Sequence, residues 1–384
     1  MKIFADENMP LVEELFAGRG EIIRGAGRHL TVRQLADVDV LLVRSVTKAN
    51  AELLEGTTVK FVGSATAGID HVDQEYLQRA GIEFAYAPGC NANSVAEYVV
   101  AALLSLAVRD RFELAGKSIG IVGHGQVGSR VAAKCRALGM ETLVNDPPLT
   151  EQGVELDCVE LNDLLGVDIL TLHVPLTFDG KYVTANLIDA DWLSRIGRPG
   201  MMIINTCRGG VLDETALWQG RASGLIGQVV LDVYQGEKSP QRVSGEALAQ
   251  ADIATPHIAG YSYDGKALGT VMLYEALAKR YGWPLETNAT ASLKTEPRDI
   301  RGPARGSGLV EKLHQALRQA YDIQQDHQKL HRATGYQGPR RGVYFDSLRR
   351  DYAVRREFTN YQATAESGYS AKILGVLKEL GFSY

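Results

Sequence analysis

Cysteine is scarce in this sequence: Cys90, Cys135, Cys158 and Cys207 are the four among 384 residues. Their spacings match neither a zinc site nor a disulfide framework, so a small disulfide-stapled secreted fold is excluded. We therefore expect four reduced thiols in a cytosolic protein, and no metal centre.

The sequence also lacks a surplus of positive charge. Its formal net charge is −5 and its pI is about 6.0, which argues against nucleic acid or an anionic membrane surface as a partner. It has no leader of the charged-then-apolar kind and no run of about 18 apolar residues. These features predict a cytoplasmic location, and they leave room for a small anionic substrate held by a few local basic residues.

Glycine, in contrast, is abundant, with 40 residues, as is usual where tight turns join strands to helices. Short apolar runs alternate with helical patterns in two successive series. The first series of expected strands comprises residues 1–5, 38–43, 59–62 and 82–85, and the second comprises 118–122, 142–145, 168–173, 201–205, 227–232 and 252–254. Strands separated by helices form parallel sheets. We therefore expect an α/β chain with two doubly wound, Rossmann-like units.

A long helix is expected at residues 91–109, between the two series, with Ser94 and Glu97 as its capping box. The character of the chain changes after about residue 284. Residues 295–307 are rich in Pro, Arg and Gly and are typical of a linker, and residues 309–331 have a helical pattern. The last 100 residues therefore form a third, smaller α+β element.

The segment from Gly123 to Gly128 matches G-x-G-x-x-G, with Gly125 as the second glycine. It follows an apolar strand pattern and precedes a helical one, which is the context that a dinucleotide-binding turn requires. In such a turn the glycines permit the tight bend, the approach of a pyrophosphate and close helix–strand packing. The free amides and the helix dipole then hold the phosphates.

Asp146 ends the next expected strand, 18 residues after Gly128. A carboxylate at this place accepts hydrogen bonds from the adenosine ribose hydroxyls and repels a 2′-phosphate. The pattern therefore favours NAD over NADP. The alternative is a structural glycine turn with a surface aspartate.

Three polar segments, residues 205–209, 232–237 and 256–261, follow three expected strands. Ligands of doubly wound sheets bind outside the carboxyl ends of the strands, so these segments reach one edge. His257 suits proton transfer near neutral pH, Glu237 would orient it, and Arg208 would hold a substrate carboxylate bidentately. Singly, each has a structural alternative: a strand-end histidine, a solvated loop carboxylate, a helix-capping arginine. Their joint order favours oxidation of a 2-hydroxy acid.

From about residue 36 to 280 the chain resembles the D-isomer-specific 2-hydroxyacid dehydrogenases. The resemblance rests on segments 42–47 (L-V-R-S-V-T), 66–73 (T-A-G-I-D-H-V-D) and 173–176 (H-V-P-L), the glycine-rich turn, and the arginine, glutamate and histidine segments. It implies a substrate-binding domain at 1–92 and 256–284, an NAD-binding domain at 93–255, a C-terminal dimerisation domain at 285–384, and a catalytic Arg208–Glu237–His257 triad between the first two.

The resemblance also implies binding residues. Those expected at NAD are Gly123, Gly125, Gln126, Val127, Gly128, Asp146, Val174, Pro175, Thr206, Cys207, Asp232 and Gly260. Those expected at the substrate are Ser45, Thr66, Tyr261 and Arg208. Hydroxyl side chains suit a polyhydroxylated acid because each donates and accepts hydrogen bonds. For Ser45 and Thr66, turn capping is an equal alternative once the resemblance is set aside.

Segments 205–210 (N-T-C-R-G-G) and 257–262 (H-I-A-G-Y-S), with the tail from residue 345, resemble a branch of the family that acts on a phosphorylated sugar acid as a homodimer. Arg44 is one candidate for the phosphate. The cluster Arg349, Arg350, Arg355 and Arg356 is another, although a solvated or interface face explains it better. Two alternatives remain: a family member acting on another substrate such as 3-phosphoglycerate, and a non-catalytic NAD-sensing protein.

Overall fold

The structure is a computed structural model, and it describes residues 1–285, 296–302 and 308–384. By its internal contacts the chain divides into two compact units. Unit 1 comprises Met1–Asn93 and Tyr261–Glu296, and unit 2 comprises Ser94–Gly260 and Pro297–Tyr384. The three functional domains expected from the resemblance stay predictions.

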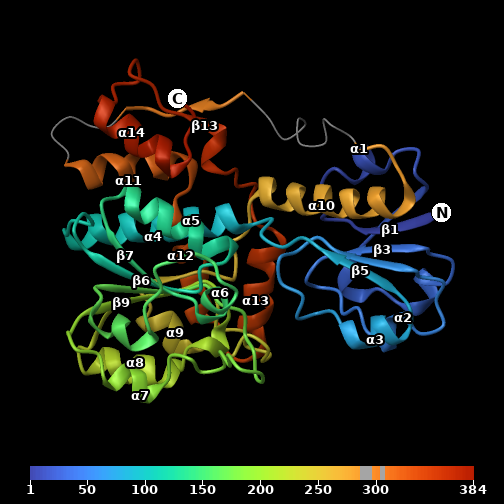
Figure 1. The fold of residues 1–384 in the computed structure, drawn as a ribbon, viewed down its shortest axis with the longest axis horizontal. Helices are drawn as coiled ribbons and strands as arrows, with labels where there is room; N and C mark the ends of the chain where they lie inside the picture. Colours follow the sequence, from blue (N-terminus) through green and yellow to red (C-terminus); the bar gives the residue numbers. More distant parts are fainter. Residues whose placement is uncertain (286–295, 303–307) are drawn as a thin grey trace. The chain divides into compact units, whose positions relative to one another are not determined.

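Unit 1 is built on a five-stranded parallel sheet with the order β2-β1-β3-β4-β5. Its strands are β1 (Lys2–Asp6), β2 (Glu21–Gly25), β3 (Val40–Val43), β4 (Phe61–Ser64) and β5 (Glu83–Tyr86), and its helices are α1 (Val12–Phe16), α2 (Ala51–Leu54), α3 (Gln74–Arg79) and α10 (Tyr263–Tyr281). Alternate strand residues pack on opposite faces: Leu42 against α1 and α10, and Leu41 against α2 and α3 (Figure 1). This alternation is the period of two that a strand imposes on its side chains.

Strand β2 was not expected from the sequence. It lies at the edge of the sheet, and its residues, E-I-I-R-G, are at most half-buried. Its apolar run is limited to Ile22 and Ile23, which is too short to signal a strand.

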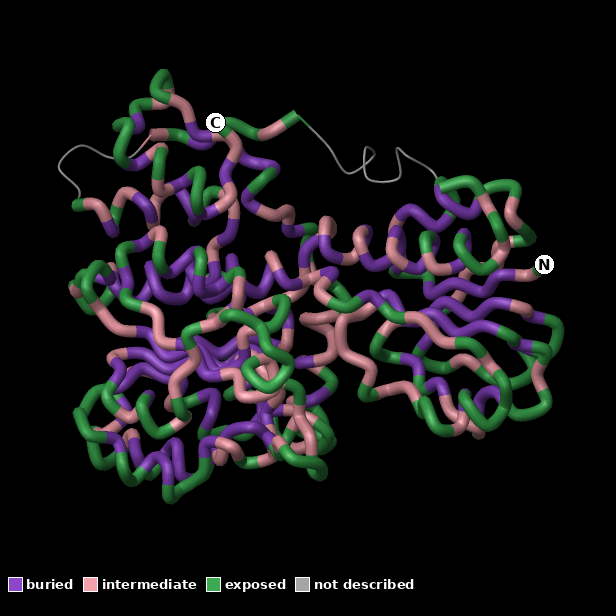
Figure 2. Tube along the Cα trace, in the orientation of Figure 1, coloured by how far each residue is buried: buried purple, intermediate pink, exposed green. Residues whose placement is uncertain are grey.

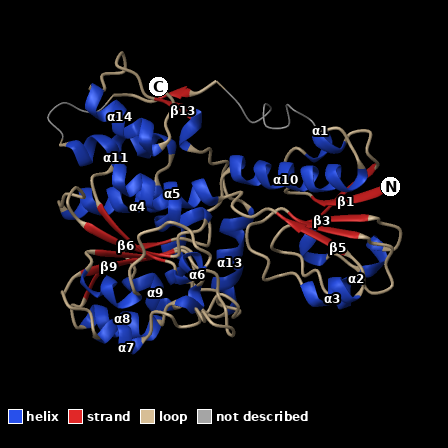
Figure 3. Cartoon of the chain, viewed as in Figure 1, coloured by secondary structure: helices blue, strands red, loops and turns tan. Residues whose placement is uncertain are grey.

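Unit 2 is built on a six-stranded parallel sheet with the order β11-β10-β9-β8-β6-β7. Its strands are β6 (Ser118–Val122), β7 (Glu141–Asn145), β8 (Ile169–Leu172), β9 (Met201–Asn205), β10 (Ile226–Leu231) and β11 (Ile253–Ala254). Its helices up to residue 260 are α4 (Ala92–Asp110), α5 (Gln126–Ala137), α6 (Pro147–Glu151), α7 (Ala190–Ser194), α8 (Glu214–Ala222) and α9 (Gly245–Gln250). Helices lie on both faces of this sheet (Figure 3). The expected α/β class with two Rossmann-like parallel sheets is confirmed.

Helix α4 is long and apolar enough to cross a membrane by length and composition, but 83% of its apolar stretch is buried inside the fold. Figure 2 shows it as a continuous buried segment. The expected capping box is wrong, since Ser94 is the third residue of the helix rather than its N-cap. The Ser94 hydroxyl instead donates to Glu357 (2.6 Å), and Glu97 accepts the backbone N–H of Phe358 (2.8 Å). These two polar residues bind the C-terminal segment to the helix.

The C-terminal part of unit 2 contains α11 (Leu309–Ala320), α12 (Ile323–His331), α13 (Pro339–Arg350), α14 (Ala371–Leu380) and the strands β12 (Arg298–Asp299) and β13 (Tyr361–Gln362). The helix expected at 309–331 is two helices, because Tyr321 is extended and Asp322 caps α12 at Gln324 N (3.2 Å).

In the expected linker, residue 295 and residues 303–307 lie outside the described residues. Residues 298–299 pair in parallel with β13, a long-range contact that local composition does not reveal.

Candidate functional site

The glycine-rich turn joins β6 to α5, as expected. Gly123 has a φ of +89°, which glycine adopts without strain. A Cβ at Gly128 would lie 1.9 Å from the Gly123 carbonyl oxygen, so the helix and the turn approach too closely for any side chain. A Cβ at Gly125 would meet nothing within 4 Å. The first and third glycines are therefore required by the fold, whereas the second leaves open space at the start of α5.

Asp146 lies beside this turn, at the end of β7. One of its carboxylate oxygens accepts the backbone N–H of His124 (2.7 Å), and the other caps α6 by accepting the N–H of Leu149 (3.1 Å). Each oxygen has a second lone pair, so the carboxylate can still accept a ribose hydroxyl. Val174 lies on the other side of the turn, because a Cβ at Gly123 would approach its side chain to 2.8 Å.

The remaining expected cofactor residues lie at the same edge. Gln126 and Val127 are the first two residues of α5, and Pro175 follows β8 next to Val174. The Thr206 hydroxyl, after β9, lies 3.5 Å from Nδ1 of His173, after β8. Desolvation lowers the pKa of His173 to about 3, which favours the neutral imidazole at ordinary pH.

The three expected catalytic segments follow β9, β10 and β11, which are neighbours in the sheet. Arg208 comes three residues after β9, Glu237 six after β10, and His257 three after β11. All three belong to unit 2. The topology therefore delivers the arginine, glutamate and histidine to one edge, as carboxyl ends of parallel strands require.

His257 and Glu237 form the central pair. Nδ1 of the imidazole lies 2.5 Å from Oε1 of Glu237, and both side chains are largely buried. Burial by itself would raise the pKa of Glu237, but its ion pair and hydrogen bond with His257, together with Arg349, hold that pKa below its usual value. A carboxylate on Nδ1 leaves Nε2 as the nitrogen that exchanges a proton with a ligand.

Asp232 organises the backbone that carries His257. Its buried carboxylate accepts the N–H of Ile258 (2.7 Å), the N–H of Ala259 (2.8 Å) and the hydroxyl of Thr255 (2.6 Å). His257 has a φ of +56°, a left-handed conformation that non-glycine residues adopt rarely. Hydrogen bonds on both sides of it hold this conformation, so Asp232, expected as a cofactor neighbour, also positions the histidine.

Hydrogen bonds and close backbone packing also fix the loop that carries Arg208. Asn205 accepts the N–H of Cys207 (3.1 Å) and donates to the Arg208 carbonyl (3.0 Å). A Cβ at Gly209 would lie 2.0 Å from the backbone of Tyr234, so only glycine lets these two loops pack. Burial raises the pKa of the Cys207 thiol to about 11. The buried thiol therefore stays protonated at ordinary pH. Cys207 directly precedes Arg208 in this loop.

The C-terminal segment also supports this site through Arg349 and Arg355, whose partners no sequence pattern predicted. Arg349 of α13 lies 3.9 Å from Oε1 of Glu237. Arg355 is buried and donates to the carbonyl of Ala259 (3.2 Å), two residues after His257, and to the carbonyl of Ser94 (2.7 Å). Thus two of the four arginines considered for a phosphate support the loops of Glu237 and His257, whereas Arg350 pairs with Asp351 at the surface.

The expected substrate residues Ser45, Thr66 and Tyr261 belong to unit 1. Ser45 is exposed after β3. The Thr66 hydroxyl donates to the carbonyl of Gly68 (2.8 Å) and lies 2.7 Å from the Ser64 hydroxyl, which is the turn-capping role considered above. It keeps acceptor capacity for a ligand. Tyr261 precedes Ser262, the N-cap of α10, and the side chain of Arg44 lies over its ring.

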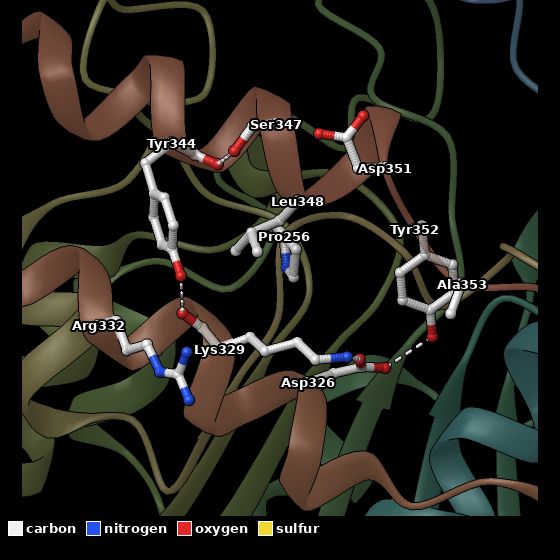
Figure 4. Close-up of a pocket in the computed structure, with 10 residues that line it drawn as sticks. All are labelled: Pro256, Asp326, Lys329, Arg332, Tyr344, Ser347, Leu348, Asp351, Tyr352 and Ala353. Atoms are coloured by element: carbon white, nitrogen blue, oxygen red, sulfur yellow. Dashed lines mark hydrogen bonds and ion pairs between the residues drawn. The ribbon is translucent and has the colours of Figure 1, made fainter.

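A cavity of about 330 Å³ lies among the C-terminal helices, next to Pro256 (Figure 4). Its polar groups are bound to one another: the Tyr352 hydroxyl donates to Asp326 (2.6 Å), and Lys329 lies 3.7 Å from the same carboxylate. None of the expected catalytic or cofactor residues lines it. Within the described residues, no three His, Cys, Asp or Glu side chains gather as a metal site.

Two family descriptions match parts of the chain. Residues 101–259 match "D-isomer specific 2-hydroxyacid dehydrogenase, NAD binding domain", and residues 304–381 match "Domain of unknown function (DUF3410)". The first match covers the glycine-rich turn, Asp146 and the triad. The second covers most of the C-terminal segment that supports the triad.

Relatives of known name match the full length. Erythronate-4-phosphate dehydrogenases of Shigella flexneri serotype 5b (strain 8401) and Escherichia coli O1:K1 / APEC are each 44% identical over 384 residues, which is 100% of this chain and 98% of theirs.

Solved structures share the fold. The TT0316 protein from Thermus thermophilus aligns with a TM-score of 0.62 at 24% identity, over 74% of this chain and 99% of its own. D-Lactate dehydrogenase from Aquifex aeolicus, in complex with NAD and lactic acid, aligns with a TM-score of 0.58 at 25% identity, over 74% of this chain and 96% of its own. With 44% identity over its full length to relatives of this name, the chain belongs to the erythronate-4-phosphate dehydrogenase family, within the D-isomer specific 2-hydroxyacid dehydrogenases.

Proposed function

We propose that this chain oxidises 4-phospho-D-erythronate with NAD⁺ to (R)-3-hydroxy-2-oxo-4-phosphooxybutanoate and NADH. It is an NAD-dependent 2-hydroxyacid dehydrogenase, and the reaction is a step in pyridoxal 5′-phosphate (vitamin B6) biosynthesis. The observation that carries the proposal is the 44% identity along the whole chain to relatives of this name. The His257–Glu237 pair at the strand ends supplies the chemistry that the reaction needs.

The residues around the glycine-rich turn fit NAD. Gly125 leaves open space at the first turn of α5, where backbone N–H groups and the helix dipole favour a pyrophosphate. Asp146 stands next to that turn with lone pairs for ribose hydroxyls, and its charge disfavours a 2′-phosphate. NAD, when bound, supplies the hydride acceptor. The twelve cofactor positions named from the resemblance are part of this proposal.

His257 is the proposed acid/base group. Its Nε2 takes the proton of the substrate 2-hydroxyl while the hydrogen on C2 leaves as hydride. Glu237 on Nδ1 stabilises the imidazolium that forms and fixes the ring orientation. Arg208, rigidly presented by Asn205 and Gly209, pairs with the substrate carboxylate and polarises the developing carbonyl. Ser45, Thr66 and Tyr261 are proposed to bind substrate hydroxyls.

The experiment is an assay of the purified chain that follows NADH formation by its absorbance and compares substrates. We expect kcat/KM for 4-phosphoerythronate to exceed that for 3-phosphoglycerate by at least about 100-fold. A substrate that lacks a hydroxyl leaves polar groups of the site without a hydrogen-bond partner, and this raises the free energy of its transition state. A preference for 3-phosphoglycerate contradicts the proposed substrate but agrees with the activity of a 2-hydroxyacid dehydrogenase. NAD binding with no turnover of any 2-hydroxy or 2-oxo acid would instead identify a non-catalytic NAD sensor.

We further propose that the chain acts as a cytoplasmic homodimer through its C-terminal segment. The support is the family resemblance of that segment and the absence of basic surplus in the sequence. Light scattering of the purified protein tests the assembly: a mass of about twice 41.8 kDa is expected. A monomeric mass at assay concentrations contradicts it.

A further inference from the structure

The ring of Tyr261 in unit 1 has two cationic side chains close to it. The guanidinium carbon of Arg44 lies 6.0 Å from the ring centroid, and Nζ of Lys266 lies 5.0 Å from it. Arg44 follows β3. Tyr261 precedes the N-cap of α10, and Lys266 is the fourth residue of the same helix. The fold therefore brings two positive charges to one side chain.

These two cations lack the usual neutralising partner. Throughout residues 1–285, 296–302 and 308–384, no ion pair joins Arg44 or Lys266 to a carboxylate. Both residues are half-buried. Burial and then the charge of Arg44 lower the pKa of Lys266 to about 8. Two like charges that are partly desolvated repel each other, and an anion placed between them removes that repulsion.

The α10 N-terminus adds to the positive potential at this place. Lys266 lies in the first turns of a 19-residue helix, whose dipole favours an anion near its start. Ser262 caps this helix by accepting the N–H of Gly265 (2.8 Å), so Lys266 is held by an ordered helix rather than by a loose loop. The feature is thus a positioned pair of cations at one aromatic ring.

We propose that Arg44 and Lys266, whose side chains both lie at the ring of Tyr261, bind the phosphate group of the substrate. The proposal rests on the proposed function and deepens it by naming the residues that separate a phosphorylated from an unphosphorylated 2-hydroxy acid. Arginine matches phosphate oxygens bidentately and lysine provides a compact point charge. The C-terminal arginines are poorer candidates because Arg349 and Arg355 already serve Glu237 and Ala259.

The test compares two substrates in matched variants. Kinetics of Lys266→Met and Arg44→Met are measured with 4-phosphoerythronate and with D-erythronate, which differs only by the phosphate. We expect KM for 4-phosphoerythronate to rise at least about 10-fold with kcat within about twofold, while kcat/KM for D-erythronate is unchanged, because only binding of the phosphate is lost. Lys266→Arg should restore most of the affinity.

Lys48 supplies the control, since it is exposed in the loop after Arg44, and Lys48→Met should leave both substrates unaffected. Equal losses on both substrates in Lys266→Met, or an unchanged KM for 4-phosphoerythronate, overturn the proposal. A wild-type enzyme that does not turn over 4-phosphoerythronate overturns the proposed function instead. In that case, calorimetry with inorganic phosphate tests the phosphate site separately. Weaker phosphate binding by Lys266→Met than by wild type supports the proposed site, and equal binding overturns it.

Discussion

Nδ1 of His257 lies 2.5 Å from Oε1 of Glu237, and the same carboxylate oxygen lies 3.9 Å from Arg349 of helix α13. The histidine comes after β11, the glutamate after β10, and the arginine from a helix about a hundred positions further along the chain. One carboxylate thus orients the imidazole ring of His257 and is itself paired with the C-terminal segment. This relationship leads to the first three predictions.

Replacing His257 should abolish most turnover. We expect His257→Ala to lower kcat by at least about 100-fold, the scale of general acid/base catalysis. Because residue 257 has a φ of +56°, His257→Asn is the matched variant: asparagine tolerates this conformation best among comparable residues. Both variants should bind NAD as wild type does in a fluorescence titration. Near-normal turnover in His257→Asn would remove the assigned role.

Glu237→Gln should lower kcat by about 10- to 100-fold, because a neutral amide stabilises the imidazolium less than a carboxylate does. Initial rates of NADH formation at saturating substrate measure the effect. A normal kcat in Glu237→Gln would mean that Glu237 is structural.

Arg349→Met should reduce kcat by about 3- to 10-fold without changing KM for NAD⁺, because a partly buried charge near Glu237 is removed. The neighbouring Arg350 is the control. It pairs with Asp351, and both side chains are exposed, so Arg350→Met should cost nothing measurable. Equal behaviour of the two variants in steady-state assays would show that α13 does not act on the triad.

The glycine-rich turn predicts a contrast between two alanine variants. In Gly128→Ala the new methyl group would lie 1.9 Å from a carbonyl oxygen. Because overpacking destabilises the folded state, the free energy of unfolding should fall by about 3 kcal/mol. In Gly125→Ala the methyl group meets no protein atom within 4 Å, and the φ of −69° permits alanine. Its Tm should match wild type while NAD affinity falls at least about 10-fold. Unchanged NAD affinity in Gly125→Ala would argue against a pyrophosphate there.

Glu97 should make stability depend on pH. Burial, followed by the charge of Glu357, raises the pKa of Glu97 from 4.5 to about 8. Between these values the folded chain keeps a proton that the unfolded chain has lost, so the free energy of unfolding should fall as pH rises from about 4.5 to 8. Glu97→Gln, which keeps an acceptor for Phe358, should make this fall shallower. Urea unfolding at pH 5, 6, 7 and 8 measures the slope, and equal slopes would contradict the assignment.

Local patterns predicted much of the fold. β6 and β9 span the expected residues, and the other expected strands differ by a few residues at their ends. Central strands of parallel sheets are buried on both faces, so each one leaves a continuous apolar run. β2 left no such run because only Ile22 and Ile23 are apolar in it. The split between α11 and α12 was missed because periodicity does not report a single extended residue such as Tyr321.

The sequence by itself determined which residues reach one edge of the sheet and are proposed to carry the chemistry, since Arg208, Glu237 and His257 each follow an apolar strand and parallel strands end at a common edge. Only the tertiary structure decided what holds them. Asp232 on the His257 loop, Arg349 on Glu237, Arg355 on Ala259 and Arg44 beside Tyr261 are contacts between distant segments. Such contacts depend on how helices and loops pack, and a single sequence carries no local pattern for charges that meet only after folding.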